Sequence, residues 1–209
     1  MKRGFLAVVV SSVLLLAAAP VFAAGPYVGL EGGAVWLSDA SVTVLGVNQG
    51  DIKFDTGWAI GAVGGYDFGT WRLEGELVYR SNGAKEFSDA VGSSPLDGDG
   101  TSTALMVNAF YDFKTLSPSV YPYIGAGIGG ASVAADLKDS GVQVVDDDEI
   151  VFAYQLVAGV AFPVSKQLAI DLNYRYFATT DPKLKDTIGD QFETEYSTHN
   201  IFVGLRYNF

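Results

Sequence analysis

The feature that most restricts the fold of this chain is a period of two in its apolar residues. Between positions 71 and 80, Trp, Leu and Tyr side chains alternate with Arg72, Glu74, Glu76 and Arg80. Successive side chains of a β-strand point to opposite faces, so this alternation predicts a strand with one apolar and one charged face. The same period predicts eight strands, at residues 27–36, 57–68, 71–80, 103–113, 121–133, 152–162, 168–177 and 200–209.

The connections between these strands alternate between short and long. The short ones are residues 69–70, 114–120 and 163–166, and the long ones are 37–55, 81–100, 135–149 and 178–195. Strands of about ten residues can cross a hydrocarbon layer when tilted. The sequence therefore predicts an all-β, eight-stranded antiparallel up-and-down transmembrane β-barrel with short periplasmic turns and four long extracellular loops. The alternative is a soluble lipocalin-like barrel with its apolar face inside.

The first 23 residues do not fit the strand pattern. Lys2 and Arg3 precede an apolar run at 5–19, and small residues end at Ala23. This order predicts a signal peptide at 1–23, cleaved after Ala23, followed by a barrel domain at 24–209. The apolar run is shorter than the roughly 20 residues that a spanning helix needs.

Charged residues are divided unevenly between the predicted connections and strands. The four long connections hold 18 acidic residues and five lysines, whereas strands and short turns hold six acidic and six basic residues. Because a charge that faces lipid at mid-depth costs about 2–4 kcal/mol, we expect the apolar face to meet lipid and the charged face to line the interior. The chain has no cysteine, which excludes a disulfide framework, and a formal net charge of −11 without a basic stripe, which argues against nucleic acid as a partner.

Charges inside such a barrel should pair, because an unpaired buried charge is costly. The predicted interior charge network consists of Glu31, Arg72, Glu74, Glu76, Arg80, Asp112, Asp171, Arg175 and Arg206. Eight strands leave an interior that side chains fill, so we expect no open pore. Two interfacial girdles are predicted from the aromatic residues near strand ends, namely Trp36, Trp58, Tyr66, Phe68, Trp71, Tyr79, Tyr111, Phe113, Phe162, Tyr176 and Phe209.

Five segments resemble one known family. They read NAFYDF at 108–113, PYIGAGIG at 122–129, FAYQLVAGV at 152–160, NYRYF at 173–177 and GLRYNF at 204–209. Together, over about residues 25–209, they resemble the OmpA-like and opacity-protein-like eight-stranded outer-membrane barrels. The resemblance implies a monomer in the outer membrane of a Gram-negative bacterium, in contact with outer-membrane lipid and lipopolysaccharide. It also implies insertion by the barrel-assembly machinery, with Leu205, Tyr207 and Phe209 as the assembly signal.

We expect a non-enzymatic envelope protein with a structural role, without cofactor, whose acidic loops make surface contacts. One alternative is a narrow porin that prefers cations, because its mouth would be acidic. Another is a lipid A-modifying enzyme, since Glu195, Ser197 and His199 share one face of the last strand and are similar to the residues of lipid A deacylases. Neighbours on one face of a strand are about 7 Å apart, beyond hydrogen-bond reach, so we expect no catalytic residues.

The acidic runs at 97–99 and 146–149 contain oxygen ligands of the kind that calcium prefers. Neither run follows the twelve-residue EF-hand pattern. We therefore expect no dedicated metal site and keep calcium binding as an alternative to a simply solvated acidic surface.

Overall fold

The structure is a computed structural model that describes residues 24–38, 40–44, 47–88, 92–95, 97–114, 119–139, 142–185 and 191–209. The predicted signal peptide, residues 1–23, lies outside the described residues. The strands are β1 (Gly25–Leu37), β2 (Ala40–Val44), β3 (Val47–Phe54), β4 (Gly57–Asp67), β5 (Trp71–Ser88), β6 (Ser93–Pro95), β7 (Asp97–Asp112), β8 (Tyr121–Asp139), β9 (Val142–Pro163), β10 (Leu168–Thr179), β11 (Lys183–Lys185), β12 (Gln191–Thr194) and β13 (Ser197–Asn208). Among the described residues, no helix has the length and hydropathy needed to cross a bilayer.

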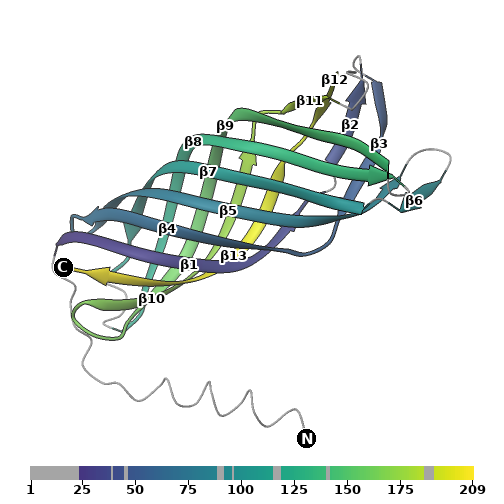
Figure 1. The fold of residues 1–209 in the computed structure, drawn as a ribbon. Helices are drawn as coiled ribbons and strands as arrows, with labels where there is room; N and C mark the ends of the chain where they lie inside the picture. Colours follow the sequence, from purple (N-terminus) through teal and green to yellow (C-terminus); the bar gives the residue numbers. More distant parts are fainter. Residues whose placement is uncertain are drawn as a thin grey trace, which may run out of the picture.

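Eight of these strands form a closed barrel, in the order β1, β4, β5, β7, β8, β9, β10, β13 and back to β1 (Figure 1). Every neighbouring pair is antiparallel, and β13 closes the ring by pairing with β1 from Asn208 opposite Tyr27 to Thr198 opposite Leu37. Closure matters because hydrocarbon offers no hydrogen bonds to an unpaired strand edge. The predicted fold class is confirmed.

The apolar face of the strands is on the outside. Leu30 and Leu105 are 68% and 66% exposed, whereas Arg80 and Arg175, on the other face, are 0% and 2% exposed. A soluble barrel would have the reverse arrangement, so the lipocalin-like alternative is wrong.

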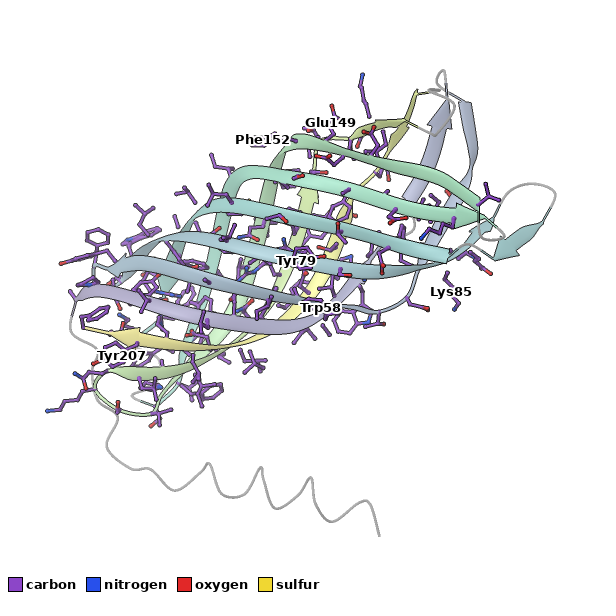
Figure 2. The ribbon with its side chains drawn as sticks, viewed as in Figure 1. Trp58, Tyr79, Lys85, Glu149, Phe152 and Tyr207 are labelled. Atoms are coloured by element: carbon purple, nitrogen blue, oxygen red, sulfur yellow. The ribbon has the colours of Figure 1, made fainter. Side chains whose placement is uncertain are left out.

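Aromatic side chains gather at two levels of the outer wall. Near the short turns, Trp71, Tyr111 and Phe113 form a row with ring centroids 4.9 Å apart. On the far side of the apolar band, Trp58 and Tyr79 contact each other at 5.6 Å. Figure 2 shows Tyr207 near the turn end of the barrel and Trp58 and Tyr79 further along the wall. Such rings mark the two membrane interfaces.

The strands run further beyond the outer girdle than the sequence pattern predicts. β8 and β9 stay paired as far as Asp139 opposite Val142, so most of the long connection predicted at 135–149 is itself strand. β5 and β7 likewise stay paired to Gly83 opposite Asp99. The period was hidden here because charged and small residues occupy the outward positions, while Leu137 and Val145 point inward and are buried.

A second sheet joins this extension at the end that carries the long connections. Its order is β11, β12, β2, β3 and β5, with β6 on the other side of β5 (Figure 1). The extracellular parts of β5, β7, β8 and β9, together with β2, β3, β11 and β12, are called the platform below.

An ion pair joins β3 to β5 in the platform. The hydrogen bond and charge of Lys53 lower the pKa of Glu86, whose Oε1 lies 2.8 Å from Lys53 Nζ.

Replacement of Val107 by arginine is expected to destabilise the barrel by about 2–4 kcal/mol, because a charge would face lipid near mid-depth. Val107 is opposite Gly75, midway between the Trp71–Tyr111 pair and Tyr79 on the neighbouring strand. Urea unfolding in lipid vesicles measures the effect. Val142→Arg is the control, since Val142 is exposed at the tip of the platform, away from lipid. An equal loss of unfolding free energy in both variants would contradict the position of Val107 in the membrane.

Candidate functional site

The barrel interior gathers the charged side chains and is the candidate site. In its central layer, Arg175 Nη1 donates to Glu31 Oε1 at 3.0 Å and to Glu76 Oε1 at 2.5 Å. The second oxygen of Glu76 accepts from Asn108 Nδ2 at 2.6 Å and from Gln155 Nε2 at 2.9 Å. These residues come from five strands of the barrel, so the network ties opposite walls together.

A second group of charges lies closer to the short turns. Arg72 Nε donates to both oxygens of Asp112, at 3.1 and 3.0 Å. Lys114 Nζ is 2.7 Å from Asp67 and 3.7 Å from Asp112. The guanidinium of Arg72 also packs over the rings of Phe110 and Tyr123, at 4.6 and 4.8 Å from their centroids. Asp112 therefore has two cationic neighbours, unlike Glu76.

Three further predicted members, Arg206, Asp171 and Glu74, make contacts outside these two groups. Arg206 Nε is 3.4 Å from Asp171 Oδ2, and Tyr27 Oη donates to Glu74 Oε2 at 2.9 Å. Tyr27 was not predicted as a partner, although its position on the polar face of the first strand was visible in the sequence. Glycine makes this packing fit, because a Cβ at Gly65 would approach the Tyr27 hydroxyl to 2.7 Å.

Arg80 is not brought together with the carboxylates. Its Nε donates to Asn200 Oδ1 at 3.3 Å, and its guanidinium lies 4.1 Å from the centroid of the Phe177 ring. Among the described residues, none offers a partner to its two terminal nitrogens. Arg80 therefore differs from the prediction that every interior arginine pairs with a carboxylate.

The reason is that the extracellular half of the interior buries apolar and uncharged polar side chains, the latter including Asn82, Ser102 and Asn200. One buried cluster there includes Leu37, Met106, Val133, Val151 and Phe177, and another consists of Val35, Ala59, Val78 and Phe202. The sequence analysis considered only the charged residues of the inward face and did not predict these apolar clusters. The alternation did indicate them, because Val78 and Phe177 follow Glu76 and Arg175 by two residues and so lie on the same face.

The residues of the hydrolase alternative do not form a catalytic group. Tyr174 Oη lies 2.6 Å from His199 Nδ1, while Ser197 Oγ donates to Ser38 Oγ at 3.0 Å. His199 and Tyr174 are exposed on the outer wall, where Tyr176 also contacts the imidazole. A nucleophile must be within hydrogen-bond reach of its base, and Ser197 has another partner.

The acidic runs proposed as calcium ligands are only partly described. The side chains of Asp97 and Asp146 lie outside the described part of the structure. Among the residues that are described, no three or more carboxylates or histidines are grouped so as to hold a metal ion.

Replacement of Arg175 by methionine is expected to cost about 3–5 kcal/mol of unfolding free energy, because two buried carboxylates lose their cation. Arg72→Met should cost less, since Asp112 keeps Lys114 as a neighbour. Adding Glu76→Gln to Arg175→Met should restore part of the loss, because the unpaired charge disappears. Urea titrations in lipid vesicles measure the unfolding free energy of each variant. Equal losses for the two arginine variants would contradict a larger contribution of Arg175 than of Arg72.

Comparisons with known proteins agree with this architecture. An uncharacterised protein of Brucella abortus is 33% identical over 131 residues, which are 50% of this chain and 46% of that protein. The chain thus spans about half the length of these curated relatives. The opacity protein opA67 of Neisseria gonorrhoeae is 26% identical over 189 residues, covering 69% of this chain and 75% of its own length.

Solved structures share the fold. OprG, an outer membrane protein from Pseudomonas aeruginosa, has a TM-score of 0.63 at 15% identity, with 90% of this chain and 97% of OprG covered. Neisserial surface protein A has a TM-score of 0.55 at 20% identity, with 88% and 97% covered. Residues 5–209 match the family described as outer membrane protein beta-barrel domain. The chain belongs to this family of outer membrane β-barrel proteins.

Proposed function

We propose that this outer membrane protein is a non-enzymatic envelope component that contacts other surfaces through its extracellular platform. The observation that carries the proposal is a second apolar core outside the membrane. Ile52, Leu137, Val145 and Leu184 come from β3, β8, β9 and β11, and each is at most 7% exposed. A core of this kind holds the extracellular strands as a fixed surface, and recognition commonly resides in segments held on a rigid scaffold.

The outward face of the platform is acidic. Asp99 on β7 is directly opposite Asp136 on β8, and Asp148 on β9 is opposite Ala134. A hollow of about 320 Å³ is lined by Asp99, Asp136, Asp147 and Asp148. Like charges opposite each other destabilise a sheet, so their presence here favours a role in contact over a role in stability. A surface of one sign attracts partners of the opposite sign.

Two observations support the absence of enzymatic activity in this proposal. His199 and Ser197 have separate hydrogen-bond partners, as described above. The interior is filled by charged, polar and apolar side chains, and the cavity among Glu31, Arg72 and Arg175 is about 30 Å³ in volume, too small for a substrate. The likeness to an opacity protein and to a surface protein supports a role at the cell surface.

Vesicles that carry the protein with its platform outward are expected to bind a polylysine-coated surface, and added salt should weaken the binding. A triple variant, Asp99→Asn with Asp136→Asn and Asp148→Asn, should bind more weakly, as measured by retained vesicle fluorescence. The matched control removes three charges elsewhere on the extracellular side, by Asp55→Asn, Asp181→Asn and Glu195→Gln. An equal loss in both triples would contradict a role for this particular face.

We further infer that the barrel-assembly machinery inserts the chain as a monomer and reads its last strand. Leu205 and Tyr207 on β13, and Phe209 directly after it, are 54%, 41% and 70% exposed. They are therefore accessible along one side of the strand that closes the barrel.

Removal of the Phe209 ring by Phe209→Ala is expected to reduce the amount of folded protein in the outer membrane of growing cells. Refolding of the purified variant into lipid vesicles should be nearly unchanged, because the Phe209 ring lies against the exposed ring of Tyr207, 5.2 Å away, and its backbone N–H keeps the hydrogen bond to Pro26 O. The control is Phe68→Ala, which removes an exposed ring at the same interface. If refolding in vitro fails as much as assembly in cells, Phe209 acts in stability and not as a signal.

A further inference from the structure

The outer wall of the barrel has an apolar hollow over β9, β10 and β13. Its volume is about 420 Å³, within the range of roughly 300–1,000 Å³ that is common for ligand sites. The hollow lies between the two aromatic girdles, on the face of the strands that meets lipid, so it opens into the membrane. Its lining includes the outward-facing residues Ala158, Val160, Leu172, Tyr174 and Ile201.

The hollow arises because one aromatic side chain leans away from it. Tyr174 lies directly opposite Ala158 on β9 and Ile201 on β13. Its hydroxyl is 2.6 Å from Nδ1 of His199, and the two rings are stacked with their centroids 6.0 Å apart. His199 precedes Ile201 by two residues, toward the extracellular end of β13. The ring of Tyr174 therefore leans in the extracellular direction and leaves the small side chain of Ala158 uncovered.

The hydrogen-bonded pair of Tyr174 and His199 marks the extracellular end of the hollow. On the outward face of β13, the residues between His199 and Tyr207 of the turn-side girdle are all apolar. On β1, Trp36 is directly opposite His199, and tryptophan is typical of the membrane interface. His199 is therefore at the extracellular interface, and the hollow beside it is at the depth of the acyl chains of the outer leaflet.

The same pair offers a hydrogen-bond donor to a lipid headgroup. A neutral imidazole has one donor and one acceptor nitrogen. When Tyr174 donates to Nδ1 of His199, Nε2 keeps its hydrogen, and Nε2 has no hydrogen-bond partner among the described residues. In the other tautomer the hydroxyl of Tyr174 is the free donor. A phosphate group accepts such a bond more strongly than an ester does, because the phosphate is charged.

We propose that the hollow and the Tyr174–His199 pair form a binding site for one lipopolysaccharide molecule of the outer leaflet. An acyl chain of its lipid A occupies the hollow, and a phosphate of its lipid A accepts a hydrogen bond from the pair. The two parts of the site share β10 and β13, so the barrel fixes the distance between them. The site binds lipid without cleaving it, since Ser197 is hydrogen-bonded to Ser38 and not to the imidazole.

The first test fills the hollow. The full barrel, purified from outer membranes and freed of lipid in a mild detergent, is mixed with lipid A, and native mass spectrometry measures the bound fraction. Ala158→Leu is expected to weaken binding by roughly tenfold, as for lost contact with about two CH₂ groups, because leucine occupies the space of the acyl chain. The matched control is Ala126→Leu, which enlarges an exposed alanine of the outer wall on β8 and should bind as wild type does.

The second test addresses the headgroup. His199→Phe keeps an aromatic ring and removes both nitrogens, so it should weaken the binding of lipid A and leave the binding of dephosphorylated lipid A unchanged. Phosphatidylglycerol, which has a phosphate but only two acyl chains, should bind wild type more weakly than lipid A does. Equal binding of the two lipids would identify a general phospholipid site and overturn the proposal.

The folded state of each variant is checked by its faster migration in gels without boiling. Equal binding of lipid A by the Ala158→Leu and Ala126→Leu variants would overturn the proposal, as would equal loss of both forms of lipid A in His199→Phe. Should Ala158→Leu fail to fold, Ala158→Val is measured in its place with the same two outcomes. Neither test involves the platform, whose binding to polylysine is measured independently.

Discussion

The need to pair every backbone N–H and C=O group inside hydrocarbon governs the rest of this structure. A sheet meets that need only when it closes on itself, and here β13 completes the ring by pairing with both β1 and β10. Closure fixes the direction of each side chain, because alternate residues must then point to lipid or to the interior. The apolar outer wall and the buried charges are two consequences of this one constraint.

The closed ring leaves a narrow interior that must be filled, and the chain fills it in two different ways. Toward the short turns, Arg72 and Arg175 pair with carboxylates. Toward the outside, apolar side chains such as Leu37, Val133 and Val151 pack together, and the Phe177 ring beside them carries the Arg80 guanidinium. Buried ion pairs add little net stability, because desolvation offsets their attraction.

Outside the membrane the same strands serve a different purpose. Water can now satisfy strand edges, so β5, β7, β8 and β9 continue without a closed ring and accept β2, β3, β11 and β12 as additional strands. The extension has its own apolar core, which allows its outward face to carry carboxylates that contribute nothing to packing. Stability and surface chemistry are thus separated into inward and outward positions, in the extracellular part as in the membrane.

The sequence by itself determined the barrel, its strand number, its direction in the membrane and the side on which charges are buried, because a period of two in a membrane leaves few alternatives. It also placed Arg175, Glu31 and Glu76 on one face. Only the tertiary structure decided which charges meet, since strand tilt sets which residues lie across the interior from one another. It left Arg80 beside Phe177 instead of a carboxylate, and it revealed the platform core. Contacts between distant strands depend on closure, and no local pattern in the sequence records them.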